Sequence, residues 1–100
     1  MKNRILNEWK GRKVVARSHD AGVYFGKLED ADGSTVRLSS VRNIWHWTGA
    51  NCLADVAEKG ITGDRVSRVV SEMVLLDVCQ VLPCSAAAIA NLEGQPVWTA

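Results

Sequence analysis

Apolar and polar residues alternate along the first half of the chain in the pattern of β-strands. Residues 13–18 contain two adjacent valines and form the first predicted strand. A turn separates them from a second strand over residues 23–28, in which Gly26 permits a bulge or a sharp bend. The Asp-Ala-Asp-Gly sequence of residues 30–33 favours a tight hairpin turn, because Asp and Gly tolerate the positive φ angles that it requires.

Two further strands are predicted beyond this hairpin. Residues 35–39 alternate strictly, which places Val36 and Leu38 on one face of a strand and polar side chains on the other. Residues 43–47 form a fourth and shorter strand. The first half of the chain is therefore expected to fold as consecutive antiparallel strands.

Helical spacing begins after Gly49. Apolar residues over 53–57 recur at positions i, i+3 and i+4, which predicts a helix of two to three turns. Asn51 is its expected N-cap, and Gly60 is the expected residue at its C-terminal end. Residues 60–68, which include two glycines, are expected to form a loop.

The spacing of residues 69–82 fits both a strand and a helix. Their β-branched content and the stop at Pro83 favour one long strand, bulged near Asp77. A second short helix and an extended tail are expected to complete the chain, with Ser85 as N-cap, residues 86–92 as the helix, Gly94 as its end and Trp98 as the anchor of the tail.

Short strands at regular intervals, followed by two helices, predict an α+β, mostly β fold. We expect a small, strongly curved antiparallel sheet or an SH3-like barrel that carries two short helices. The 100 residues suffice for a single domain over 1–100. Residues 1–12 are predominantly basic and form a leader that could be flexible.

Charge and cysteine content narrow the classes of partner and cofactor. The formal net charge is only +1, which is too small for a long nucleic-acid groove. No apolar segment has the character of a signal peptide or a membrane helix, so we expect a cytoplasmic protein. Cys52, Cys79 and Cys84 are odd in number and lack the paired spacing of a zinc site, so we expect reduced thiols, no metal and no cofactor.

Catalytic motifs are missing from the sequence. It contains no nucleophile elbow, no HExxH zinc motif and no phosphate-binding loop. Cys84 precedes the second predicted helix, where a helix N-terminus could lower its pKa, but no clear base lies beside it. We therefore expect a protein that is not an enzyme.

The segment RNIWHWTGAN, residues 42–51, combines aromatic and basic side chains at high density. In a regular strand Trp45 and Trp47 would share one face, and Ile44 would take the other. The indoles could lie in the core or at a subunit interface, since large aromatic side chains are usually buried. They could also form an exposed binding surface, and the sequence leaves both alternatives open.

An exposed surface at this segment would have the components of a site for a nucleotide-like ligand. Aromatic rings can stack on a base, guanidinium groups can bind phosphate, and the free N–H groups at the start of a helix favour an anion. One arginine is close in sequence, and two others lie on strands expected in the same sheet. The candidate ligand-binding residues are Arg17, Tyr24, Arg37, Arg42, Trp45, Trp47, Gly49 and Asn51.

Three motifs occur together in the chain: AGVYFG at residues 21–26, RNIWHWTGAN at 42–51 and LPC at 82–84. With this AGVxFG strand, RxIWxWxGAN segment and closing xPC strand, the chain resembles a family of small uncharacterised proteins of tailed phages and prophages. The resemblance covers residues 13–98 and leaves the basic leader outside. It implies a phage-encoded accessory protein that acts in the cytoplasm of a bacterial host, where such proteins often blunt host defence.

Two functions of different classes are consistent with these features. The protein could be a counter-defence sponge that sequesters a nucleotide-type host immune signal, which requires phosphate donors that converge on the indoles. It could instead be a protein–protein interaction module that inhibits a host defence protein through an exposed Trp patch, which requires an apolar surface without such donors. Arg42 and the predicted helix start favour the sponge.

A homo-oligomer is expected in either case. Four tryptophans and the apolar residues 73–82 present more apolar surface than one small barrel readily buries. We expect a dimer first, because two-fold pairing is the commonest solution, with residues 42–51 at or near the subunit junction.

Overall fold

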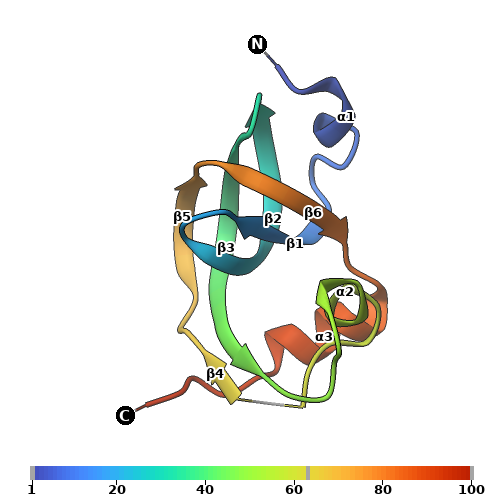
Figure 1. Ribbon diagram of the computed structural model, residues 1–100, viewed down its shortest axis with the longest axis vertical. Helices are drawn as coiled ribbons and strands as arrows, with labels where there is room; N and C mark the ends of the chain where they lie inside the picture. Colours follow the sequence, from blue (N-terminus) through green and yellow to red (C-terminus); the bar gives the residue numbers. More distant parts are fainter. Residues whose placement is uncertain (1, 63, 100) are drawn as a thin grey trace.

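The computed structural model describes residues 2–62 and 64–99, which form one curved sheet with short helices outside it (Figure 1). Met1, Gly63 and Ala100, which belong to the predicted leader, loop and tail, lie outside the described residues. The elements in chain order are α1 (Arg4–Asn7), β1 (Lys13–Ser18), β2 (Gly22–Asp32), β3 (Thr35–Trp47), α2 (Leu53–Lys59), β4 (Asp64–Val66), β5 (Val70–Leu75), β6 (Val78–Pro83) and α3 (Ala86–Glu93).

All strand pairs of the sheet are antiparallel. The strand order is β4-β3-β2-β1-β6, and β5 pairs with β3 as well. One edge of β3 therefore carries β2, and the other carries β5 and then β4. The predicted α+β, mostly β class with a small, strongly curved antiparallel sheet is confirmed, and α1 is an additional helix that the sequence pattern did not predict.

The strand β3 is continuous where the sequence predicted two separate strands. It bends because Ser40 takes a φ of 51°, in the left-handed region. The register against β2 shifts around Gly26, where an added Cβ atom would lie 3.1 Å from the carbonyl oxygen of Ser39. The predicted bulge at Gly26 is confirmed, and the missing side chain allows the two strands to approach closely where β3 bends.

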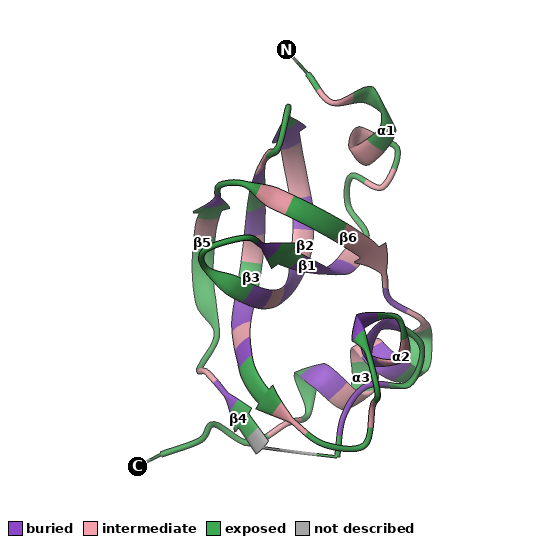
Figure 2. Cartoon of the chain, in the orientation of Figure 1, coloured by how far each residue is buried: buried purple, intermediate pink, exposed green. Residues whose placement is uncertain are grey.

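The two faces of the sheet bury two separate hydrophobic clusters (Figure 2). Adjacent residues of β1 show the division, because Val14 belongs to one cluster and Val15 to the other. The inner cluster, inside the curve of the sheet, consists of Val14, Ala16, Leu28, Ala31, Val36, Leu38, Val41 and Leu75. The helix-side cluster, which α2 and α3 cover, consists of Val15, Val23, Phe25, Ile44, Leu53, Val56, Ala57, Ile61, Val66, Cys84, Ala88 and Leu92.

The predicted loop and long strand of the second half are both interrupted. The loop over residues 60–68 contains the short strand β4, which pairs with the end of β3. The strand predicted over residues 69–82 is divided into β5 and β6 at Asp77, whose φ of 51° turns the chain. Asp77 therefore lies in a turn between two strands, whereas the sequence pattern predicted a bulge within a single strand.

Both predicted helices of the second half are confirmed. Gly60 follows α2 with a φ of 81°, a conformation that glycine adopts without strain. The Ser85 hydroxyl accepts a hydrogen bond of 3.0 Å from the backbone N–H of Ala88 and caps α3, and Gly94 follows the end of this helix. Among the described residues, no helix is long and apolar enough to cross a membrane.

Substitution of Leu38 tests the assignment of the inner cluster. Leu38 is fully buried there, whereas Thr35, on the same strand, is only partly buried. We expect Leu38→Ala to lower the free energy of unfolding by about 2–5 kcal/mol, since the change leaves a cavity. Thr35→Ala should cost less than about 1 kcal/mol. Urea denaturation of both variants measures the difference, and equal losses would contradict the assignment.

Candidate functional site

A bulge near the end of β3 determines where its two indoles point. Ile44 and His46 pair with consecutive residues of β4, so Trp45 between them is the extra residue. The bulge interrupts the alternation of the strand: Ile44 is buried, Trp45 is 46% exposed, and Trp47 packs against the helix-side cluster. The expectation that Trp45 and Trp47 share one face is therefore wrong.

Trp45 and Trp98 form an exposed aromatic pair. Their ring centroids lie 5.9 Å apart with an interplanar angle of 89°, the edge-to-face arrangement that indoles favour. The guanidinium carbon of Arg65 lies 4.8 Å from the centroid of Trp98, in a cation–π contact. The backbone N–H of Trp98 donates a 3.1 Å hydrogen bond to the carbonyl of Val66, which fixes the tail on β4. We call Trp45, Arg65 and Trp98 the aromatic patch.

Arg42 points into the protein and is absent from this patch. Only 3% of the residue is exposed, and its guanidinium donates hydrogen bonds of 2.8 Å to the carbonyl of Ser67 and 2.9 Å to that of Leu92. Burial lowers the pKa of the guanidinium below its ordinary value. The carbonyl of Leu92 belongs to the last turn of α3, so Arg42 caps the negative end of a helix. Its predicted role as a phosphate ligand is contradicted by this burial.

Gly49 and Asn51 shape the turn between β3 and α2. Gly49 has a φ of 82°, and an added Cβ atom would lie 2.0 Å from the hydroxyl of Thr62. The N-cap of α2 is Cys52 and not the predicted Asn51, whose backbone N–H donates a 3.1 Å hydrogen bond to the Asp55 carboxylate. A carboxylate of the first turn therefore already occupies the positive end of this seven-residue helix.

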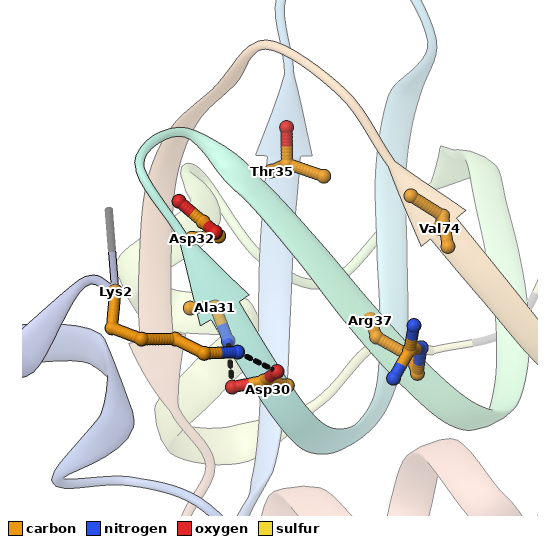
Figure 3. Close-up of a pocket in the computed structure, with 7 residues that line it drawn as sticks. All are labelled: Lys2, Asp30, Ala31, Asp32, Thr35, Arg37 and Val74. Atoms are coloured by element: carbon orange, nitrogen blue, oxygen red, sulfur yellow. Dashed lines mark hydrogen bonds and ion pairs between the residues drawn. The ribbon is translucent and has the colours of Figure 1, made fainter.

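The three remaining candidate residues lie apart from the aromatic patch. Arg17 is exposed on β1, and β2 separates that strand from β3. Arg37 is exposed on β3 and lines a hollow of about 180 Å³ at the far end of that strand (Figure 3). Tyr24 packs against the inner cluster and lines a hollow between the β1–β2 and β5–β6 turns, whose lining includes none of the patch residues. The structure therefore does not bring the predicted ligand-binding residues together in one site.

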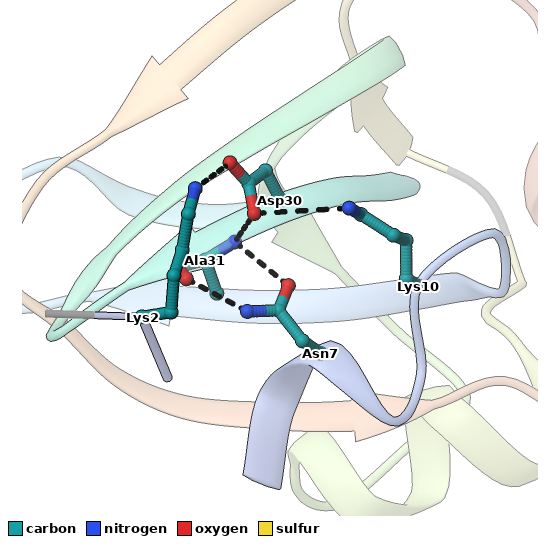
Figure 4. A network of polar contacts seen from close by, with 5 residues as sticks. All are labelled: Lys2, Asn7, Lys10, Asp30 and Ala31. Atoms are coloured by element: carbon teal, nitrogen blue, oxygen red, sulfur yellow. Dashed lines mark hydrogen bonds and ion pairs between the residues drawn. The ribbon is translucent and has the colours of Figure 1, made fainter. Parts of the chain in front are cut away.

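The basic leader is docked along the end of β2 (Figure 4). The Asn7 side chain donates a 2.9 Å hydrogen bond to the carbonyl of Ala31 and accepts one of 3.0 Å from its N–H. Lys2 forms an ion pair with Asp30, and the ammonium of Lys10 lies 3.9 Å from the same carboxylate. The hydrogen bond from Lys2 is the main cause that lowers the pKa of Asp30. In its described part the leader is thus held in place, where the sequence allowed it to be flexible.

One of the three cysteines, Cys84, is buried, and the other two are exposed. All three are free thiols, and burial raises the pKa of Cys84 from 9.0 to about 12, against a smaller opposite effect of Arg12. The expectation that the helix start lowers this pKa is wrong, because desolvation outweighs it. In the described part of the chain, no group of three or more His, Cys, Asp or Glu side chains could hold a metal ion.

Sequence reasoning identified only one of the three patch residues. Trp98 was expected to anchor the tail, which it does, but nothing local indicated that it reaches Trp45. Arg65 lies in a segment that the sequence pattern assigned to a loop. Its pairing with β3 depends on a tertiary contact that spans almost twenty residues of chain.

The family model of a domain of unknown function (DUF6948) matches residues 11–92. The chain belongs to this family. The match begins within the basic leader and ends in α3, so it includes β3 and β4 but not the tail that carries Trp98. No protein with a curated description matches the chain.

A solved structure of a heptameric archaeal Sm protein is similar to this member of the DUF6948 family. The similarity has a TM-score of 0.56 at 19% sequence identity and covers 83% of this chain and 100% of that chain. At this level of identity the similarity establishes the fold, an Sm-like barrel of the SH3-like type.

Substitution of Arg42 tests its structural role. Arg42→Met keeps most of the stem but leaves two backbone carbonyls without their donor, which should cost about 2 kcal/mol or more of unfolding free energy. The matched variant Arg65→Met removes an exposed guanidinium and should cost less than about 1 kcal/mol. Chemical denaturation measures both, and a smaller loss for Arg42→Met would overturn this role.

The raised pKa of Cys84 predicts a specific dependence of stability on pH. The native state keeps the thiol proton above pH 9, where the unfolded state loses it, so stability is fully present below that pH and declines as pH rises towards about 12. The limiting slope is about 1.4 kcal/mol per pH unit. Unfolding free energies of wild type and Cys84→Ala, measured between pH 8 and pH 11, should converge. Parallel curves would contradict the assignment.

Proposed function

We propose that this protein is a non-enzymatic binding module whose aromatic patch contacts a protein partner. The observation that carries this proposal is the exposed pair of Trp45 and Trp98 with Arg65 stacked on one ring. Trp and Arg are the residue types most enriched at the energetic centres of protein interfaces. The rings are also held in place by their mutual contact and by the backbone bond of Trp98, which reduces the entropy lost on binding.

The alternative of a nucleotide sponge has less support. It depended on Arg42 and on the N–H groups at the start of α2 as hydrogen-bond donors to a phosphate beside the indoles. Arg42 is buried on backbone carbonyls, and Asp55 would repel a phosphate at the helix start. Arg65 is the one patch residue that could meet a phosphate, and its guanidinium already lies over Trp98.

The nature of the partner rests on the resemblance to phage and prophage proteins. That resemblance supports a bacterial host protein as the partner and the host cytoplasm as the place of action. A defence protein that the module inhibits is the proposed target, since small accessory phage proteins often have this role.

The module is further proposed to act as a homo-oligomer that assembles through two open sheet edges. Among the described strands, β5 pairs only with β3, and β6 pairs only with β1. Four exposed large apolar side chains lie on or beside β5: Val69, Val70, Val74 and Leu76. The edge strand β5 has Glu72 as its one charged residue and β6 has none, so neither carries the lysines that commonly block an edge.

Two different edges favour a closed ring over the dimer expected from sequence. Pairing of β5 with β6 of the next copy is a head-to-tail contact, which leaves one open edge at each end until a ring closes. The heptameric assembly of the archaeal Sm protein provides a precedent for a ring built on this fold. We therefore propose that the junction lies at β5 and β6, which would leave residues 42–51 free to bind the partner.

Light scattering tests the assembly. Wild-type protein at tens of micromolar should have a mass above that of a dimer, and Val74→Lys, which places a charge on the exposed face of β5, should reduce it towards a monomer. Ile5→Lys is the matched control, because Ile5 is an exposed apolar residue on α1, outside both edges. A monomeric wild type, or equal masses for the two variants, would contradict the proposal.

A variant of the aromatic patch distinguishes a protein partner from a nucleotide ligand. Host proteins retained by wild type but not by Trp45→Ala should be purified and titrated calorimetrically. Trp45→Ala should weaken their binding by about 30-fold or more, the effect of a loss of 2 kcal/mol, while Arg37→Ala should not. A thermal-shift screen with mono-, di- and cyclic nucleotides should leave the melting temperature unchanged. Stabilisation by a nucleotide that Trp45→Ala abolishes would instead support the sponge.

A further inference from the structure

A second candidate site lies beside two turns of the sheet and is lined by none of the residues of the aromatic patch. A hollow of about 360 Å³ lies between the turn that joins β1 to β2 and the turn that joins β5 to β6. This volume falls within the lower range of small-molecule sites. Its lining includes Ser18, Asp20, Tyr24, Met73, Leu76 and Asp77.

Hydrogen bonds between the two turns hold the walls of this hollow in place. The buried Ser18 hydroxyl donates a 2.6 Å hydrogen bond to the carbonyl of Leu76 and accepts one of 3.4 Å from the N–H of Ala21. The backbone N–H of His19 donates a 2.9 Å hydrogen bond to the carbonyl of Asp77. The cavity is therefore formed before any ligand arrives, which limits the entropic cost of binding.

The lining combines apolar walls with charge of a single sign. Tyr24 and Met73 are half-buried against the inner cluster and offer a ring and a thioether, and Leu76 is exposed at the rim. Asp20 and Asp77 are the only charged residues in the lining, and both are acidic. Within the described part of the chain, neither carboxylate has an ion-pair or hydrogen-bond partner.

We propose that this hollow binds a cationic alkyl chain, meaning an ammonium or guanidinium group carried on a methylene stem. The two carboxylates attract the cation, and the Tyr24 ring can add a cation–π contact. The stem packs on Met73 and Leu76, whose polarisable and apolar atoms suit methylene groups. Anions, nucleotides included, are repelled here, so this ligand class differs from both functions considered for the aromatic patch.

Two sources can supply such a group. A lysine or arginine side chain of a protein and a free polyamine present the same ammonium or guanidinium chemistry on a flexible stem. The experiment therefore uses one small probe from each source: N-acetyl-arginine amide and spermidine. The neutral isostere N-acetyl-citrulline amide keeps the shape of the first probe and lacks its charge.

Backbone amide chemical shifts in the intact protein provide the test. Either cationic probe should cause saturable shifts at Ala21, Leu76 and Asp77, and the citrulline compound should not. Asp20→Asn and Asp77→Asn should each weaken binding by about two- to fivefold, the effect of an exposed ion pair. Asparagine tolerates the positive φ at position 77, so this variant should remain folded.

Glu58→Gln is the control for the loss of one negative charge elsewhere, since Glu58 is exposed on α2 and does not line the hollow. It should bind both probes as wild type does. The stronger binder of the two cationic probes identifies the source, a protein side chain or a polyamine. Equal shifts with the citrulline compound, unchanged affinity in both Asp variants, or shifts confined to other surfaces would overturn the proposal.

Discussion

The fold depends on the close approach of β2 and β3 where β3 bends. One strand pairs with β2 on one edge and with β5 and β4 in succession on the other, so it must curve through a large angle. Gly26 permits this curvature, because an added Cβ atom would press on the backbone of Ser39. Because of this curvature, the inner cluster lies on one face of the sheet. The helix-side cluster lies on the other face, where α2 and α3 cover it.

Arg42 connects β3 to two other segments of the chain. Its guanidinium reaches the carbonyl of Ser67, between β4 and β5, and that of Leu92, at the end of α3. A buried cation with several carbonyl acceptors fixes these three segments relative to one another, since each unpaired carbonyl would cost free energy. The tail that follows α3 then returns to β4, where Trp98 meets Trp45. The proposed binding surface thus depends on Arg42, which is buried outside it.

The sequence pattern predicted what depends on local chemistry and missed what depends on distant contacts. The alternation of Val36 and Leu38, the bulge at Gly26 and the cap at Ser85 follow from side-chain size, backbone freedom and hydrogen-bonding capacity. The single course of β3, the strand that carries Arg65 and the inward turn of Arg42 depend on which strands pair across the barrel. The eight candidate ligand-binding residues are predicted from proximity in sequence and from expected membership of one sheet. The bulge at Trp45 directs even the two neighbouring indoles to different surroundings.

The sheet edges and the aromatic patch are proposed to have separate roles. The open edges of β5 and β6 are proposed to join copies of the chain, while Trp45, Arg65 and Trp98 remain accessible to a partner. Hydrogen exchange measured at low and high protein concentration tests this division most directly. Backbone amides of residues 70–75 and 78–82 should exchange more slowly as concentration rises, and those of residues 44–47, 97 and 98 should be unaffected. Concentration-dependent protection of residues 44–47 without protection of β5 and β6 would contradict it.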